Sequence, residues 1–129
     1  MKVQGFNHVT IDVSDLERSL TFYTQVLGMR LVHKARHDAY LEWGMAWVCL
    51  QERPALPKPR PQLGVNHVAF SIAPDDFHEA VAVLRSHGVP IVRGPVQRGA
   101  GWTVNFLDPD GMQLELHTSN LAARMAVWT

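Results

Sequence analysis

Gly5-Phe6-Asn7-His8-Val9 recurs 59 residues later as Gly64-Val65-Asn66-His67-Val68. After each copy comes a short alternating apolar run, then an acidic turn, then a stretch with apolar residues at helical spacing. Each of these stretches ends at a glycine, Gly28 or Gly88. A repeat of this length and order indicates that the chain carries one structural module twice.

Both modules have the same predicted order of elements, β-α-β-β-β. The first helix is expected to start at Ser14, because Ser14-Asp15-Leu16-Glu17 has the form of a capping box. The second is expected to start near Asp75 or Asp76 and to end at Gly88. The strands expected after the helices span residues 29–34, 39–43 and 46–51, and then 90–93, 102–107 and 113–117. The pattern predicts an α+β chain of two tandem βαβββ modules.

The expected organisation is a single domain of residues 1–129. Module one covers about residues 5–52 and module two about residues 64–118, with a C-terminal segment at 119–129. Residues 53–62 carry four prolines, at positions 54, 57, 59 and 61. Proline cannot donate to a sheet ladder, so this stretch predicts an extended linker.

Asp108-Pro109-Asp110-Gly111 lies between the last two predicted strands. Proline presets φ and glycine accepts a positive φ, so the sequence predicts a hairpin turn. Its carboxylates alone do not supply the ligands of a calcium loop, and a plain turn is the interpretation that the sequence favours.

Charge and composition exclude several classes of function. Twelve basic residues balance twelve acidic ones, and no Lys/Arg run gives an electrostatic case for nucleic acid. No apolar run approaches the ~20 residues that span a bilayer. Residues 1–6 lack the apolar region of a signal peptide, so a cytoplasmic location is expected. A single cysteine, Cys49, excludes an intrachain disulfide; it is interpreted as a packing residue of its strand.

The repeat places two histidines at equivalent points of two sheets. A helix covers one face of each sheet, and the other face is expected to line a cavity. Residues i and i+2 of a strand share a face, so His8 and Thr10 lie together, and His67 takes the equivalent point in module two. Packing alone gives no reason for an imidazole at both points.

The segment Leu114–His117 alternates apolar and polar residues. Its leucines are expected to face the core, and Glu115 and His117 to face the cavity. Two histidines and a carboxylate on one cavity resemble a facial triad with open positions for a divalent metal. His117 is the rival for a ligand position. The remaining histidines are expected on the surface without a role: His33, His37, His78 and His87.

Seven stretches in order along the chain resemble one family, the FosA-type fosfomycin-resistance transferases. These belong to the glyoxalase / bleomycin-resistance / extradiol-dioxygenase (vicinal oxygen chelate) superfamily. The resemblance covers nearly the whole chain. The stretches are His8-Val9-Thr10, Ala39-Tyr40-Leu41-Glu42-Trp43-Gly44, Trp47-Val48-Cys49-Leu50, Asn66-His67-Val68-Ala69-Phe70, Phe106-Leu107-Asp108-Pro109-Asp110-Gly111, Leu114-Glu115-Leu116-His117 and Leu121-Ala122-Ala123-Arg124.

The resemblance implies a half-barrel built from the two modules and a homodimer that holds Mn²⁺. Each metal would take His8 from one chain, and His67 and Glu115 from its partner. The reaction implied is opening of the epoxide of fosfomycin by the thiol of glutathione. The partners implied are therefore a second copy of the chain, a small-molecule substrate and a thiol.

The resemblance also implies roles around the metal. Thr10 matches a threonine that hydrogen-bonds the epoxide oxygen, and Tyr40 a tyrosine near the phosphonate and the thiol. The substrate-binding positions are Trp47 as an aromatic wall, Arg93 and Arg124 as cations for the phosphonate, and Asn105 in place of a tyrosine. A loop that binds potassium in the family reads Gly99-Ala100-Gly101-Trp102 here, without a carboxylate, which speaks against a potassium site.

Other functions remain open from the sequence. Asp38 stands near the position where a related epoxide-hydrolase branch has a glutamate that activates water, so hydrolysis, or a lyase or isomerase reaction, competes with thiol transfer. A non-enzymatic drug-binding protein would usually lack the complete triad. An Fe²⁺ extradiol dioxygenase would share the ligands but usually carries four modules. Thr10 and Tyr40 together favour thiol transfer.

Overall fold

The computed structural model describes residues 1–57 and 63–127. The chain divides into two compact units, Met1–Pro57 and Lys58–Thr129. The division falls within the predicted proline-rich linker, of which residues 58–62 lie outside the described residues. Within residues 1–57 and 63–127, no helix has the length and apolar character needed to cross a membrane.

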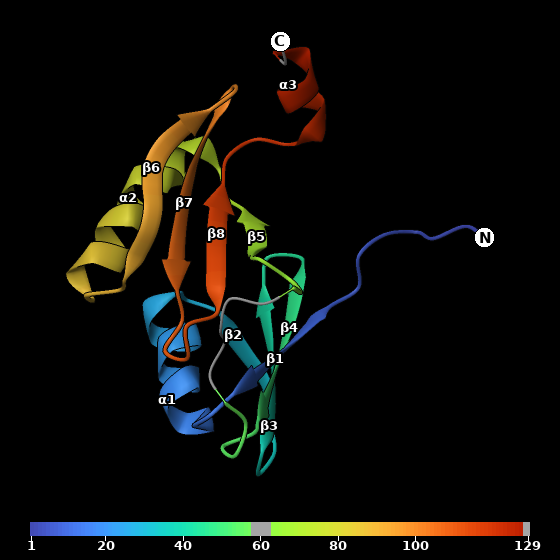
Figure 1. Ribbon diagram of the computed structural model, residues 1–129, viewed down its shortest axis with the longest axis vertical. Helices are drawn as coiled ribbons and strands as arrows, with labels where there is room; N and C mark the ends of the chain where they lie inside the picture. Colours follow the sequence, from blue (N-terminus) through green and yellow to red (C-terminus); the bar gives the residue numbers. More distant parts are fainter. Residues whose placement is uncertain (58–62, 128–129) are drawn as a thin grey trace. The chain divides into compact units, whose positions relative to one another are not determined.

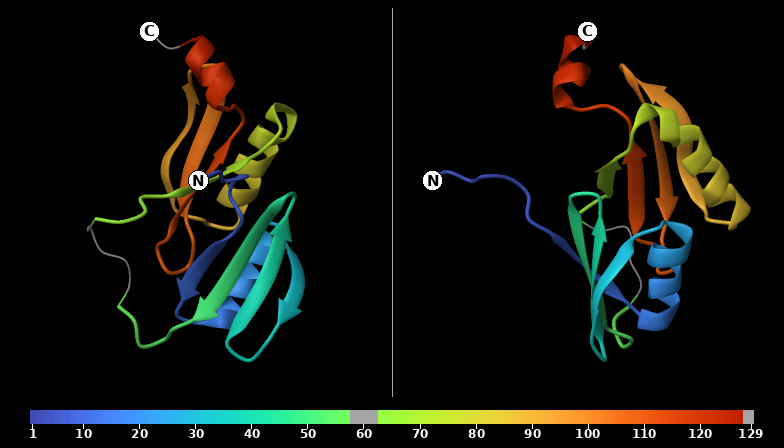
Figure 2. Two further views of the ribbon diagram at one scale, coloured as in Figure 1. Left: turned by 90° about the vertical axis from the view of Figure 1, so that its right-hand side faces the viewer. Right: turned by 180° about the vertical axis from the view of Figure 1, so that it is seen from behind.

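The first unit is a four-stranded sheet with a helical segment on one face (Figures 1 and 2). The strand order is β1-β4-β3-β2, with β1 parallel to β4 and the other neighbours antiparallel. Its elements are β1 (Val9–Val13), α1 (Leu16–Leu20), the π-helical η1 (Thr21–Val26), β2 (Arg30–Lys34), β3 (Asp38–Trp43) and β4 (Ala46–Glu52).

The second unit repeats this plan with the strand order β5-β8-β7-β6. The edge strand β5 is parallel to its neighbour β8, as β1 is to β4. Figure 2 shows α2 lying along one face of this sheet. Its elements are β5 (Val68–Ser71), α2 (Pro74–Ser86), β6 (Ile91–Arg98), β7 (Gly101–Leu107), β8 (Gln113–His117) and α3 (Leu121–Ala126). The predicted βαβββ order is confirmed in both units.

Alternation along the strands separates a core face from an open face in each sheet. In the first unit α1 packs near β4, and in the second α2 packs near β7. The side chains between sheet and helix are almost fully buried: Leu16, Leu41, Val48 and Leu50 in the first unit, and Phe77, Leu84, Phe106 and Leu114 in the second. Burial of this apolar surface stabilises both units and leaves the opposite sheet faces available for polar side chains.

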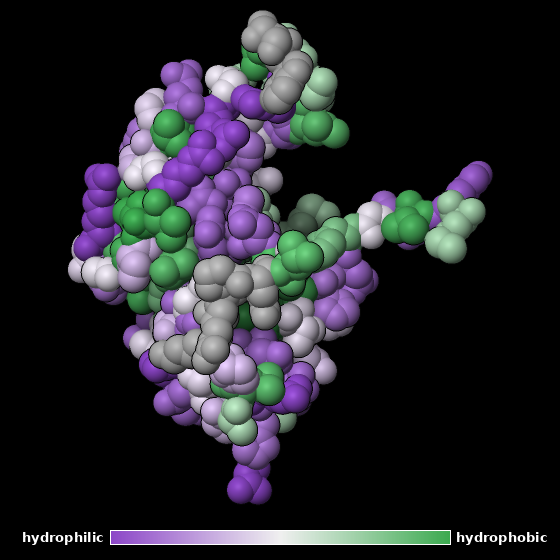
Figure 3. Space-filling view, in the orientation of Figure 1, coloured by the Kyte–Doolittle hydropathy of each residue, from purple (hydrophilic) through white to green (hydrophobic). Residues whose placement is uncertain are grey.

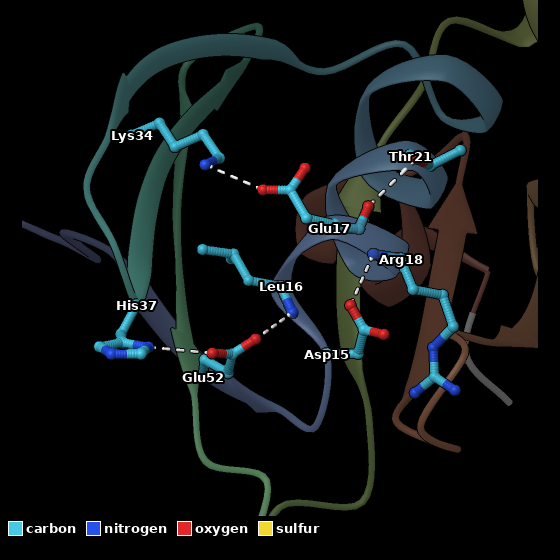
Figure 4. A network of polar contacts seen from close by, with 8 residues as sticks. All are labelled: Asp15, Leu16, Glu17, Arg18, Thr21, Lys34, His37 and Glu52. Carbon is cyan, nitrogen blue, oxygen red and sulfur yellow. Dashed lines mark hydrogen bonds and ion pairs between the residues drawn. The ribbon is translucent and has the colours of Figure 1, made fainter.

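The start of α1 differs from the prediction. The N-cap residue is Asp15, not Ser14, and its Oδ1 accepts a hydrogen bond from the Arg18 N–H at 3.0 Å. The N–H of Leu16 instead donates to Glu52 Oε2 at 2.8 Å, a contact 36 residues away in sequence (Figure 4). Two carboxylates thus satisfy the free N–H groups of this helix end.

Element bounds in the second unit also differ from the prediction, most of all for α2 and β6. The helix α2 begins at Pro74, a residue before the predicted start, because proline is favoured in the first turn. The strand β6 extends to Arg98 instead of ending at Arg93. Its pairing with β7 is irregular between Arg93 and Val96, where Gly94 has φ of 84° and a Cβ would lie 2.6 Å from the Thr103 carbonyl oxygen. Glycine therefore lets the strand continue past a proline.

The predicted hairpin turn between β7 and β8 is confirmed. Asp108 is buried, and its Oδ1 accepts hydrogen bonds from the N–H groups of Asp110 and Met112 at 2.9 and 2.8 Å. The Gly111 N–H donates to the Asp108 carbonyl oxygen at 3.0 Å. Asp108 Oδ1 therefore stabilises the turn by accepting its backbone N–H groups, as aspartates commonly do in turns.

Candidate functional site

His67 and Glu115 meet on the open face of the second sheet. Glu115 pairs in register with Ala69, and His67 lies two residues before Ala69, so the two side chains share a face. Leu114 and Leu116 are buried on the other face, as predicted. His67 Nε2 lies 3.7 Å from Glu115 Oε1.

Both histidines of the repeat make the same local hydrogen bond. His8 Nδ1 lies 2.6 Å from Asn7 Oδ1, and His67 Nδ1 lies 2.7 Å from Asn66 Oδ1. An amide oxygen only accepts, so in each pair Nδ1 is the donor, and in a neutral ring the lone pair then lies on Nε2. In His67 that nitrogen is the one that faces Glu115.

The donor set of His67 and Glu115 fits a divalent metal. Two ligand atoms about 2.1 Å from one ion are roughly 3.0–3.4 Å apart at bond angles of about 90–110°, so the observed 3.7 Å closes with a shift of a few tenths of an ångström. Among the residues that the structure describes, no three His, Cys, Asp or Glu side chains form a group that could hold a metal. The pair therefore needs a further ligand.

His117 lies on the other side of the same carboxylate. Its Nδ1 is 3.6 Å from Glu115 Oε2, beyond direct hydrogen-bond distance. The two Glu115 oxygens thus point to different imidazoles, Oε1 to His67 and Oε2 to His117. The two histidines therefore lie against different oxygens of the same carboxylate.

Three neighbouring side chains form a row across the open face of the first sheet: Thr10, Cys49 and Tyr40. The strand register places Thr10 beside Cys49 and Cys49 beside Tyr40. Thr10 and Tyr40 are exposed, whereas Cys49 is only 7% exposed. The burial of Cys49 agrees with the packing interpretation, but its side chain lies on the open face, between the two candidate catalytic residues, and not in the core against α1.

Aromatic rings connect His8 to this row. The His8 ring lies 4.4 Å from the Trp47 ring between centroids, and Trp47 meets Tyr40 edge to face at 5.9 Å. Trp47 and Tyr40 also border a pocket of about 500 Å³ near the β3–β4 turn, together with Val32, Leu41, Glu42, Gly44, Met45 and Ala46. The predicted aromatic wall at Trp47 is therefore half-exposed and lies directly beside a candidate ligand.

The open face of the second sheet holds buried polar atoms. Glu115 pairs with Asn105, and Asn105 with Arg93, so these three share a row. Asn105 is 3% exposed and Thr103 1%, and neither Asn105 Oδ1 nor Thr103 Oγ1 has a hydrogen-bond partner. Buried polar atoms without partners are rare in folded proteins and suit a site that receives a polar ligand. Thr103 was not among the residues predicted from the sequence; its alternation with Asn105 was the available signal.

The second candidate arginine lies on α3. Arg124 packs over the β6–β7 turn, and a Cβ on Gly99 would lie 2.8 Å from its Nη1. A Cβ on Gly101 would lie 2.6 Å from the Ser119 Cβ. The glycines of this turn thus allow the C-terminal segment to approach the hairpin closely.

The four histidines without a predicted role are all exposed. His37 has a structural contact, since its Nδ1 lies 2.9 Å from Glu52 Oε1 (Figure 4). The Leu16 N–H and then His37 hold the pKa of the Glu52 carboxyl below its ordinary value. Asp38 begins β3 on the same face as Tyr40 and is half-buried.

Comparisons with known proteins identify the family of the chain. The family model described as "Glyoxalase/Bleomycin resistance protein/Dioxygenase superfamily" matches residues 5–116. Glutathione transferase FosA of Serratia marcescens is 42% identical, over 96% of this chain and 87% of the relative. Metallothiol transferase FosB of Staphylococcus epidermidis is 35% identical, over 97% and 89%. The structure of the fosfomycin resistance protein FosX from Mesorhizobium loti has a TM-score of 0.77 at 29% identity, over 96% and 99%.

Proposed function

Because the chain belongs to the glyoxalase / bleomycin resistance protein / dioxygenase superfamily, we propose that it is a metal-dependent transferase that opens the epoxide of fosfomycin with the thiol of glutathione. The observation that carries the proposal is the pair of His67 Nε2 and Glu115 Oε1, 3.7 Å apart on the open sheet face. The similarity to a glutathione transferase and to a metallothiol transferase supports both the metal and the thiol.

We assign His8, His67 and Glu115 as the metal ligands, with Mn²⁺ as the ion. A divalent ion at this place supplies Lewis-acid polarisation of the epoxide oxygen. Imidazole nitrogen and carboxylate oxygen, with open positions left for substrate, suit a catalytic ion of this kind.

Side chains on the two open faces have separate tasks. Thr10 donates its hydroxyl to the epoxide oxygen as negative charge develops there. Tyr40 orients the thiol. The sulfur bonds to an epoxide carbon while the carbon–oxygen bond breaks, and the proton lost from the thiol ends on the released oxygen as a hydroxyl. Arg93 and Arg124 pair with the phosphonate, and Asn105 donates its amide N–H to it. Trp47 closes the site with an aromatic wall.

We further propose a homodimer in which His8 of one chain joins His67 and Glu115 of the other. Phe6 and Val65, two residues before His8 and His67, are 83% and 76% exposed in the single chain. The uncovered apolar residues of the N-terminal segment stand out in Figure 3. Exposed apolar patches mark protein–protein interaction sites, so these residues support the proposed dimer. Glutathione as the thiol fits a cytoplasmic enzyme.

A mixing experiment tests the shared site. Chains with His8→Ala and chains with Glu115→Gln should each be inactive. If they exchange at random after mixing in equal amounts, half of the dimers contain one of each, and one of the two sites in those dimers is intact. About a quarter of wild-type activity should return. No recovery, with exchange verified by mass spectrometry, would show that the site is built within one chain.

Product analysis tests the reaction. Fosfomycin, glutathione and Mn²⁺ should give a glutathione adduct by mass spectrometry, with His67→Ala inactive. His87→Ala, at an exposed histidine that caps α2, should keep full activity as the matched control. Fosfomycin recovered unchanged under these conditions would refute the assignment.

Asp38 supports one competing reaction, hydrolysis of the epoxide. It is half-buried and shares a face with Tyr40, where a carboxylate could take a proton from water. A diol formed without thiol, and lost in Asp38→Asn, would establish hydrolysis in place of transfer.

A further inference from the structure

Each of the two repeat histidines has an asparagine immediately before it, and in both cases the side chains are hydrogen-bonded. The Nδ1–Oδ1 distances are 2.6 Å for His8 with Asn7 and 2.7 Å for His67 with Asn66. The two pairs come from different units of the chain, so the contact occurs twice in separate surroundings. A chance surface contact gives no reason for the same atoms to pair in both.

We propose that Asn7 and Asn66 are positioning residues that hold His8 and His67 in the Nδ1–H tautomer and thereby present Nε2 to the metal. This inference rests on the ligands assigned above and names the groups that orient them. Neither asparagine touches the reacting atoms.

The physical basis is the limited hydrogen-bonding capacity of the two groups. A neutral imidazole has one N–H and one lone pair, and which nitrogen holds the proton depends on its partners. An amide oxygen at 2.6–2.7 Å accepts from Nδ1 and so fixes the lone pair on Nε2. Ligand histidines generally need such a partner, and its removal costs typically 10–100-fold in metal affinity.

The surroundings of the two rings predict unequal effects. The His8 ring also packs against the Trp47 ring, with centroids 4.4 Å apart and the planes tilted by 34°, so a second group restrains its orientation. The second contact of His67 is with Glu115, itself an assigned ligand. Loss of Asn66 should therefore weaken metal binding more than loss of Asn7.

The first measurement is ¹⁵N NMR of the imidazoles in the metal-free full-length protein, at a pH where they are neutral. His8 and His67 should both show Nδ1–H. In Asn66→Ala, His67 should become a mixture of tautomers while His8 stays unchanged. His87 is the internal reference, because its Nδ1 is 3.0 Å from the Val83 carbonyl oxygen, a contact that the variant leaves intact.

The second measurement is Mn²⁺ affinity by calorimetry. Asn66→Ala should bind at least about 10-fold more weakly, and Asn66→Asp, which keeps an acceptor oxygen, should stay within a few-fold of wild type. Asn120→Ala removes another asparagine contact, the N-cap bond from the Ala123 N–H to Asn120 Oδ1, and should leave Mn²⁺ affinity unchanged.

Two results would overturn the proposal: Nε2–H on His67 in the metal-free wild type, or an Asn66→Ala protein with wild-type tautomer and affinity. If circular dichroism shows that Asn66→Ala does not fold, the proposal is tested by the tautomer of the wild-type protein and by the tautomer and Mn²⁺ affinity of Asn7→Ala. Wild-type Mn²⁺ affinity in His67→Ala would instead refute the ligand assignment, and with it this inference. A missing glutathione adduct would count against the proposed reaction while the tautomer and the affinity still decide the role of the asparagines.

Discussion

Cys49 gives a sharp test of the open face of the first sheet. Its register neighbours are Thr10 on β1 and Tyr40 on β3. Neighbouring strands are about 4.8 Å apart, so the thiol fills a gap of roughly 10 Å between the backbones that carry the two candidate catalytic side chains. Cys49→Leu adds a branched side chain in this gap and should push Thr10 or Tyr40 aside by about 1 Å. A displacement of that size can cost on the order of 10²-fold in rate.

The assay is kcat/KM for the glutathione adduct, with thermal unfolding of each variant measured alongside. Cys49→Leu should lose about 10²-fold in kcat/KM while the protein stays folded: overpacking at one site costs about 1–3 kcal/mol, which lowers the midpoint of unfolding by roughly 3–15 °C. Cys49→Ala should keep activity within a few-fold. If Cys49→Leu is as active as wild type, the row does not form part of the site. If Cys49→Ala is inactive, the thiol has a chemical role and the steric argument is wrong.

Three further predictions concern stability and the phosphonate. The pKa of Glu52 is lowered from 4.5 by the Leu16 N–H first and His37 second, with Lys34 contributing, so its stabilising effect is complete above pH 4.5 and disappears as the pH falls through the lowered pKa. Glu52→Gln should therefore be less stable than wild type in urea at pH 7, and the difference should shrink progressively as the pH is lowered below 4.5; a difference that stays the same from pH 7 into acid would refute this. Asp108→Ala removes two backbone hydrogen bonds in a buried turn and should lower stability by about 1–3 kcal/mol, while Ca²⁺ should leave the wild-type melting temperature unchanged. Gly101→Ala should raise KM for fosfomycin more than it lowers kcat, because the added Cβ would displace the segment that carries Arg124; a purely kcat effect would contradict it.

Local patterns were sufficient to predict most of the fold. The repeat around His8 and His67, the alternation in Leu114–His117 and the helix-ending glycines depend on neighbours in sequence, and the structure confirms the elements built from them. The position of Glu115 opposite the core leucines followed from the same alternation. Such signals hold because strand and helix periodicities are set by the backbone itself.

Features that depend on distant residues were not predictable in this way. The Leu16 N–H donates to Glu52, 36 residues away, and no local motif reveals this contact. The capping motif separately placed the N-cap at Ser14, one residue before the observed Asp15. The extension of β6 past a proline depends on the close approach of Gly94 to β7. The burial of Thr103 and Asn105 without hydrogen-bond partners depends on the position of β7 between β6 and β8, which the local sequence does not give. Register and packing decide each of these cases.

The two modules share the Asn-His pair of the candidate site and differ in its other residues. Both present Asn-His before the first strand, with the same Nδ1 hydrogen bond. Where the first sheet pairs Thr10 with Cys49, the second pairs Ala69 with Glu115. The proposed hydrogen-bond donor Thr10 therefore belongs to one sheet and the proposed metal ligand Glu115 to the other, so neither module alone carries both groups. A site that uses all of these groups must draw on both kinds of module, which is why the duplication, and not either sheet alone, is the unit on which the proposed chemistry depends.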